Sequence, residues 1–383
     1  MSGAPSSGAQ PGPPLSSAGD AFEVRLGTPA DEPEIRALVA ATAMPGAVAV
    51  RFAREPDYFA GTTIMGDPCD VVVVRERRTG RLAGIGCRAE RRAFVNGREE
   101  RIGYIGQIRA ADGDRGRWLV HRAMAWLRES GHTDLLYCGV VARENPRARE
   151  LLVGRRAPGA PVLKRLAGLT TCAILLRPRR PPRIPGVEVE PGSAGSIPEI
   201  VAFLREEGPR RQLFPAYTVE GFTDGRTLRG LAPEDVAVAR RGGRVVGVMA
   251  AWDQAAFKQD VVAAYGPTLR RLRPAYNALA RLLGARPLTR PGAAIPLAFA
   301  ACAAVADDDP AVMQGLLAAC AERARTCGKA FLMLGLADSD PLLPVARRWL
   351  HVTYRSDLFT LAWDGARVPV PDGRLPFIEI ATL

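Results

Sequence analysis

Residues 70–74 read DVVVV and residues 82–86 read LAGIG, with a glycine-containing turn between them. β-Branched runs on either side of such a turn predict a β-hairpin. The same pattern returns as DVAVA at residues 235–239 and VVGV at residues 245–248, again around glycine. The two copies begin 165 positions apart. The sequence therefore predicts the same kind of hairpin at two places in the chain.

The repeat continues on the N-terminal side of both hairpins. Residues 22–25 alternate like a strand and lead into a helix start at residues 28–31, and residues 187–190 do the same ahead of Ser193. The two strand starts are again 165 positions apart. Because unrelated domains would not keep this offset, the sequence predicts a duplicated unit.

The repeat also continues beyond each hairpin, as a strand, a loop, a helix and another strand. The glycines expected to end the two helices, Gly131 and Gly328, are 197 positions apart. The second copy has therefore gained about 32 residues, which we place at about 257–290. The elements fall at residues 104–110, 112–116, 118–129 and 135–141 in the first copy and 297–305, 306–310, 312–325 and 331–336 in the second.

These offsets divide the 383 residues into two domains. Residues 1–20 are mainly Ser, Gly, Pro and Ala, so we expect a disordered tail. The first domain is expected over residues 21–176 and the second over residues 187–383. Residues 177–186, RPRRPPRIPG, form a short stiff linker, since proline fixes φ and removes a hydrogen-bond donor.

A unit with this order of elements resembles the GNAT acyltransferase superfamily. The resemblance implies an α/β (α+β) fold, with two tandem GNAT folds that each have a mixed, mostly antiparallel central sheet flanked by helices. In that family the strand before the loop splays from its neighbour, and the exposed backbone pairs with the pantetheine arm of acyl-CoA. The loop and the following helix N-terminus hold the pyrophosphate, because they offer unpaired N–H groups and a positive dipole end.

In the first domain the resemblance places the coenzyme along the end of strand 104–110 and the loop after it. The family's loop motif aligns with RGRWLV at residues 115–120, where bulky residues replace both motif glycines and Arg115 and Arg117 supply positive charge. The residues expected to bind the coenzyme are Ile108, Arg109, Ala110, Gly113, Arg115, Gly116, Arg117, Trp118 and Leu119.

The candidate catalytic residues are Glu55, Tyr104 and Asn145. Tyr104, on the cleft strand, is either a polar pocket residue or a buried packing tyrosine. Asn145 begins the sequence NPRA, which is similar to a family motif that commonly continues into a Leu-Tyr pair, but Leu152 stands in place of that tyrosine. In many family members the tyrosine protonates the departing thiolate, a contribution of ~10²–10⁴-fold. Either another group or water supplies this proton, or the domain binds without turnover. Glu55 is a possible base in the segment that caps the acceptor pocket, or a surface charge beside an aromatic packing cluster.

The second domain has a different loop, ADDDP at residues 306–310. Three carboxylates at a helix N-terminus are good capping groups, but they would repel a pyrophosphate. We therefore expect this domain not to bind coenzyme A in the family manner. It would serve a structural role or complete the acceptor pocket of the first domain.

The insertion at residues 257–290 has an amphipathic pattern, since Leu269, Leu272, Tyr276, Leu279 and Leu283 recur at helical spacing. Its seven basic residues stand against Asp260 alone, a local excess of +6. Such a helix packs on its own domain with a solvated arginine face, or docks on an anionic membrane or an acidic partner such as an acyl carrier protein.

Composition excludes several other functions. The net charge is +12, yet only three of the 52 basic residues are lysines, and no basic run is interleaved with aromatic residues, so no nucleic-acid partner is expected. The seven cysteines form no Cys-x-x-Cys pair and the three histidines stand apart, so no metal site is expected. No apolar stretch reaches the ~20 residues of a membrane span and no secretory signal is present, which favours the cytoplasm.

The resemblance implies an acyl-CoA-dependent N-acyltransferase, with acetyl-CoA or another acyl-CoA as co-substrate and no metal. The acceptor would be a small-molecule or peptide amine. The alternative is a catalytically inactive tandem GNAT-fold protein that acts as an acyl-CoA sensor or protein-interaction scaffold. Trp118, Leu152 and residues 307–309 favour this alternative.

Overall fold

The computed structural model describes residues 21–44, 46, 48–111, 117–153, 159–179, 182–282, 284 and 286–383. The tail expected at residues 1–20 and most of the predicted coenzyme loop lie outside the described residues.

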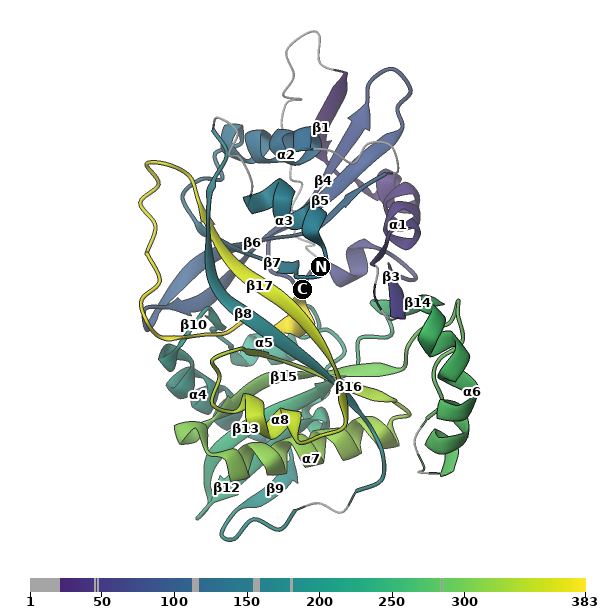
Figure 1. Cartoon of the computed structure of the whole chain (residues 1–383). Helices are drawn as coiled ribbons and strands as arrows, with labels where there is room; N and C mark the ends of the chain where they lie inside the picture. Colours follow the sequence, from purple (N-terminus) through teal and green to yellow (C-terminus); the bar gives the residue numbers. More distant parts are fainter. Residues whose placement is uncertain are drawn as a thin grey trace, which may run out of the picture.

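One 13-stranded sheet runs through both halves of the chain (Figure 1). Its strand order is β1-β4-β5-β6-β7-β17-β8-β16-β15-β13-β12-β9, and β11 pairs with β5. In that order the strands are β1 (Phe22–Leu26), β4 (Cys69–Glu76), β5 (Leu82–Val95), β6 (Arg98–Ala110), β7 (Leu136–Ala142), β17 (His351–Ala362), β8 (Val162–Leu175), β16 (Phe331–Ala337), β15 (Leu297–Val305), β13 (Arg244–Trp252), β12 (Val236–Arg241), β9 (Glu188–Pro191) and β11 (Phe214–Pro215).

The other described strands form two small sheets. One contains β14 (Gln259–Tyr265), β3 (Val48–Ala53) and β2 (Ala43–Met44), and the other contains β10 (Arg211–Gln212) and β18 (Leu375–Pro376). The α-helices are α1 (Glu32–Ala41), α2 (Arg117–Glu129), α3 (Pro146–Val153), α4 (Ile197–Glu207), α5 (Val219–Thr223), α6 (Pro267–Leu282), α7 (Pro310–Thr326) and α8 (Leu343–Arg347). The short 3₁₀ helices are η1 (Pro29–Asp31), η2 (Phe59–Gly61), η3 (Ala194–Ser196), η4 (Gly208–Arg210), η5 (Pro233–Asp235), η6 (Ala306–Asp308) and η7 (Ile380–Thr382).

Both predicted hairpins are confirmed. Strands β4 and β5 pair with Val73 opposite Ile85, and strands β12 and β13 pair with Val238 opposite Val248. The apolar run of β4 is continuous because both of its faces are covered: Val73 packs into the core shared with α1, and Val72 into the core beneath α2. Helices α1 and α4 contribute to the first of these cores, and α7 covers the other face in the second half.

The two halves exchange strands at the centre of the sheet. Strand β8 of the first half pairs with β16 of the second, and strand β17 of the second half pairs with β7 of the first. In addition, β14 from the insertion pairs with β3 from the first half, with Val261 opposite Arg51. The two expected domains therefore share one sheet, and residues of the second half lie beside the first-half site.

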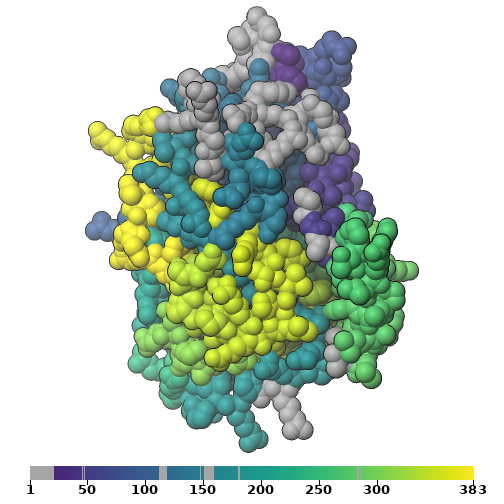
Figure 2. Space-filling view, viewed as in Figure 1, coloured from purple at the N-terminus to yellow at the C-terminus, as the bar shows by residue number. Residues whose placement is uncertain are grey.

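The insertion forms β14 and α6, but the predicted apolar face of α6 is partly wrong. Tyr276 and Ala280 pack against Leu175, whereas Leu272 and Leu279 are 56% and 55% exposed. The helix stands out from the flank of the molecule in green in Figure 2. Tyr276 and Ala280 form the inward face against Leu175, so the sides of the helix that carry Leu272 and Leu279 face solvent. Within the described ranges, no helix has the length and apolar character needed to cross a membrane.

Candidate acyl-transfer site

Strands β6 and β7 lie side by side for only three residue pairs and then part. The parallel pairing runs from Ile102 to Tyr104, although β6 continues to Ala110. Gln107 has a φ of 53°, and the register of β6 against β5 shifts at this point. A left-handed residue is uncommon outside glycine, and such a bulge bends a strand away from its neighbour. The predicted splay is therefore present in the first half.

Three polar side-chain atoms around this splay are buried without a hydrogen-bond partner. They are Oε1 of Gln107, Nε of Arg109 and Nε of Arg91. An unsatisfied buried polar atom costs about 1–3 kcal/mol, so such atoms concentrate where a ligand completes the site. Helix α2 begins at Arg117, shortly after β6 ends. These features fit a pantetheine arm between the strands and a pyrophosphate at the helix N-terminus.

The second half repeats the splay but fills it with its own residues. Strands β15 and β16 also pair over three positions only, and Cys302 has a φ of 52° in the place corresponding to Gln107. Here, however, the backbone N–H of Cys302 donates to Oε2 of Glu379 at 2.8 Å. The side chain of Ile380 covers Gly335 so closely that a Cβ there would lie 2.3 Å from its Cγ2. The segment around η7 thus occupies this gap.

The N-terminus of α7 is also occupied. Oδ1 of Asp309 accepts hydrogen bonds from the backbone N–H groups of Ala311 and Val312 at 2.8 and 3.4 Å. The same carboxylate pairs with Arg241 at 2.7 Å, and this hydrogen bond lowers the pKa of Asp309. An anionic ligand would have to displace this internal cap. The arrangement supports the expectation that only the first half holds a coenzyme, which remains a prediction.

Tyr104 lies where β6 and β7 part, and it is only 3% exposed. The guanidinium of Arg91 lies 5.6 Å from its ring centroid, and no described residue hydrogen-bonds its hydroxyl. Burial raises the pKa of Tyr104 well above its usual range, so the hydroxyl keeps its proton at neutral pH. Tyr104 can therefore donate a hydrogen bond or a proton to a group in the splay.

The other two candidate catalytic residues lie elsewhere. The side chain of Glu55 is 57% exposed and forms an ion pair with Arg36. Asn145 caps α3, since its Oδ1 accepts a hydrogen bond from the backbone N–H of Ala148 at 3.0 Å. The structure does not bring either residue to Tyr104, and neither enters the function proposed below.

The predicted coenzyme residues are only partly described. Ile108, Arg109 and Ala110 form the end of β6, and Leu119 is buried in the core beneath α2. Gly113, Arg115 and Gly116 lie outside the described residues. Arg117 and Trp118 begin α2, and their side chains also lie outside the description, as does that of Leu152 in α3.

The sequence allowed the second half to complete the acceptor pocket, but it did not identify the residues that reach this region. Nη1 of Arg91 donates to Oγ1 of Thr382 at 2.8 Å, and Nζ of Lys258 donates to the backbone oxygen of Ala381 at 2.9 Å. Burial, and then repulsion from Arg54, lower the pKa of Lys258 to about 7. No sequence pattern indicates these two contacts, because each joins residues more than a hundred positions apart.

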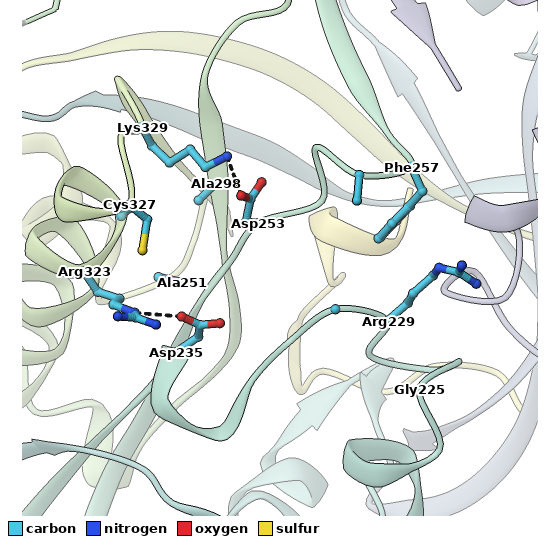
Figure 3. A pocket seen from close by; sticks show the side chains of 13 residues that line it. Gly225, Arg229, Asp235, Ala251, Asp253, Phe257, Ala298, Arg323, Cys327 and Lys329 are labelled. Carbon is cyan, nitrogen blue, oxygen red and sulfur yellow. Dashed lines mark hydrogen bonds and ion pairs between the residues drawn. The ribbon is translucent and has the colours of Figure 1, made fainter. Parts of the chain in front are cut away.

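The cavity in Figure 3 lies away from the splay, at the C-terminal end of α7, and has a volume of about 570 Å³. Its charges are largely paired: Lys329 contacts Asp253 at 2.5 Å and Arg323 contacts Asp235 at 2.8 Å. None of the predicted site residues lines it. In the part of the chain that the structure describes, no group of three or more His, Cys, Asp or Glu side chains could hold a metal.

Solved structures with the same arrangement are GNAT-fold proteins. A GCN5-related N-acetyltransferase from Sphaerobacter thermophilus has a TM-score of 0.54 at 14% identity, over 96% of this chain and 100% of that one. An N-myristoyltransferase from Saccharomyces cerevisiae with bound myristoyl-CoA has a TM-score of 0.59 at 9% identity, over 95% and 88%. No protein-family model and no curated protein matches the sequence. The chain has the GNAT fold, with a large mixed sheet flanked by helices.

Proposed function

We propose that this protein is an acyl-CoA-dependent N-acyltransferase of the N-acetyltransferase type, with its coenzyme site in the first half. The observation that carries the proposal is the difference between the two splays. The one beside Gln107 is lined by unsatisfied polar atoms, whereas the one beside Cys302 is filled by Glu379 and Ile380. Two neighbours in fold are named as an N-acetyltransferase and as an N-myristoyltransferase with bound myristoyl-CoA, which supports the same reading.

The reaction needs little covalent chemistry from the protein. The thioester supplies an activated acyl group, the amine nitrogen bonds to the acyl carbon, and the carbon–sulfur bond breaks. The amine loses one proton and the departing sulfur gains one. The protein's contribution is to align the two reactants and to donate a proton or hydrogen bond. Tyr104 is the group we assign to the donation, because its protonated hydroxyl lies at the splay and is free of other described partners.

The test is thiol release from acetyl-CoA and longer acyl-CoAs with a panel of amines. Amine-dependent release supports the proposed enzyme. The alternative function is an inactive acyl-CoA sensor or protein-interaction scaffold, which the replacement of the family's tyrosine by Leu152 favours. Tight binding of an acyl-CoA with no release across the panel would support that alternative and refute the transferase.

We also propose that α6 docks an acidic partner, such as an acyl carrier protein that delivers the acyl group. Exposed Leu272, Leu279 and Leu282 give this helix an unpartnered apolar surface. Arg270 and Arg271 are exposed beside them, and Arg270 also lines a second cavity of about 660 Å³. Apolar anchors ringed by cations match a partner with apolar and acidic side chains.

Reversing charge on this helix should weaken carrier binding. With both Arg270 and Arg271 changed to Glu, we expect the affinity for an octanoyl-loaded acyl carrier protein to fall at least about 10-fold, because steering and contact energy are both lost. Calorimetric titration measures this change, and Arg78→Glu on the exposed β4–β5 turn is the control. Equal affinity of the double variant and the control would refute this docking surface.

A further inference from the structure

Two arginines of the first half lie over one aromatic ring. The guanidinium carbon of Arg54 is 5.6 Å from the ring centroid of Phe52, and that of Arg109 is 5.2 Å from the same centroid. Arg54 is 6% exposed and Arg109 is half-buried. Stacking on an aromatic ring stabilises a cation, but it does not neutralise the charge.

Neither guanidinium has an acidic partner in the described part of the chain. Nη1 of Arg54 donates to the carbonyl of Ala53 at 2.8 Å, and Nη1 of Arg109 donates to the carbonyl of Ile108 at 2.9 Å. Both bonds are to the adjacent residue, and Nε of Arg109 is buried with no partner. Most donors of both groups are therefore free to bind something else.

Two other arginines with little exposure are paired with carboxylates. Arg88, which is 2% exposed, contacts both Asp70 and Glu90. Arg211 contacts Asp308 at 2.5 Å and Asp340 at 2.7 Å. Arg54 therefore differs from Arg88, the other arginine below 9% exposure among the described residues, in having no carboxylate partner, and an unpaired buried cation destabilises the fold. A destabilising buried charge of this kind is expected at a functional site, where a bound ligand offsets it.

Several titratable groups face this pair, and none of those described forms an ion pair with it. Burial raises the pKa of Tyr58 and of Tyr104, so both hydroxyls keep their protons. The thiol of Cys87 differs: hydrogen bonds with Cys69 and Tyr58, and then the charges of Arg54 and Arg109, lower its pKa. Asp260 is the acid whose field reaches Arg54, but burial raises its pKa and its Oδ1 has no partner. Lys258 adds a further basic group close to Arg54.

The pair lies next to the site of acyl transfer. Arg109 follows the bulge residue Gln107 by two positions, in the strand segment expected to carry the pantetheine arm. Its guanidinium reaches Phe52 of β3, in the same core that contains Tyr104. An anion held here would lie in the same core as Tyr104, the residue assigned to proton donation.

From this geometry we infer that Arg54 and Arg109 bind a carboxylate or phosphate group carried by the acceptor amine. The preferred acceptors are then amines such as amino acids, peptides with a nearby carboxylate, or aminoalkyl phosphates. Two planar guanidinium groups provide the parallel N–H donors that an oxyanion accepts, and the anion removes their mutual repulsion. This inference rests on the proposed transferase function and names the class of its acceptor.

Matched acceptors test the inference on the full-length protein. The panel pairs glycine with glycinamide, glutamate with glutamine, and phosphoethanolamine with ethanolamine, at saturating acetyl-CoA. We expect at least one member with the added anion to have a kcat/KM about 10-fold or more above its neutral counterpart, mainly through KM. If neutral amines react equally well, the inference is wrong and the transferase stands. If no amine of the panel or of the wider panel above releases thiol, the transferase itself fails.

Two variants supply a readout that does not depend on activity. Because Arg54 is a buried unpaired cation, Arg54→Met should keep or raise the thermal midpoint of the free protein, and so should Arg109→Met. Both variants should also lose the midpoint increase that phosphoethanolamine produces in the parent. The control Arg92→Met, on an exposed side chain, should keep that increase. A fall of several degrees in the midpoint of both variants would show that the pair is structural and overturn the inference.

Discussion

Replacing Arg88 with methionine should lower the free energy of unfolding by about 3–5 kcal/mol, the largest stability effect that we expect from one substitution. The side chain is 2% exposed and holds three neighbours at once. Nε donates to the Tyr137 hydroxyl at 3.0 Å, Nη1 donates to Asp70 at 2.8 Å, and Nη2 pairs with Glu90. These contacts tie β4, β5 and β7 together behind the splay.

The cost arises from what the substitution leaves behind. Methionine fills most of the arginine volume, but Glu90 remains 8% exposed without its main cation. The Tyr137 hydroxyl keeps its hydrogen bond to the carbonyl of His132 at 2.9 Å. Glu90 then keeps only Arg101, whose side chain is 65% exposed and lies 3.3 Å away. This weakly compensated carboxylate therefore accounts for most of the loss, since a buried charge without a close partner is costly.

Urea denaturation followed by tryptophan fluorescence measures this change. Arg78→Met is the control, because its side chain is 84% exposed and lies 4.0 Å from Glu76; its expected effect is below about 0.5 kcal/mol. Adding Glu90→Gln to the Arg88 variant should recover part of the loss. If Arg88→Met costs less than about 1 kcal/mol, the buried network does not stabilise the fold as argued.

Replacing Tyr104 with phenylalanine should reduce kcat on the order of 10²-fold while leaving acyl-CoA affinity within about 3-fold. The change removes only the hydroxyl, which no described residue hydrogen-bonds, so the fold should be unaffected. In the proposed transferase, Leu152 stands where many members of the superfamily have a tyrosine, so the proton for the departing sulfur needs another source. Tyr104 is the protonated group that the structure places at the splay.

Steady-state thiol release, with acyl-CoA affinity from calorimetry, separates the two parts of this prediction. The control is Tyr58→Phe, which removes a neighbouring buried hydroxyl that is bonded to Cys87 at 3.3 Å. Its kcat should change by less than about 3-fold. An unchanged kcat in Tyr104→Phe would exclude Tyr104 as the donor and assign that step to water or to another side chain.

Local patterns in the sequence were sufficient to predict the repeated unit. The β-branched runs that predict hairpins at residues 70–86 and 235–248 depend on neighbouring residues only, and both hairpins form. The exchange of β8 and β17 and the pairing of β14 with β3 were not predictable in this way. These contacts join segments far apart in sequence, where periodicity carries no information on pairing.

The candidate site was likewise predictable only where it depends on local sequence. Strand 104–110 follows from the order of elements, and its parting from the next strand was implied by the resemblance to the GNAT superfamily. Arg54, Phe52 and Lys258 meet this strand only through tertiary contacts. The spacing of leucines in α6 identifies one helical face but not which face the protein covers, and Leu272 and Leu279 are exposed for that reason. The prediction of Glu55 as a base rests only on its place in the segment expected to cap the acceptor pocket, and its carboxylate faces solvent.

The central claim is that one acyl-CoA binds per chain, at the first-half splay and the N-terminus of α2. Calorimetric titration with acetyl-CoA and longer acyl-CoAs tests it most directly, on the parent, Arg117→Glu and the control Arg128→Glu at the other end of the same helix. We predict one site in the parent, affinity at least about 10-fold weaker in Arg117→Glu, and little change in the control. Two sites per chain, no binding of any acyl-CoA, or full affinity in Arg117→Glu would contradict the claim.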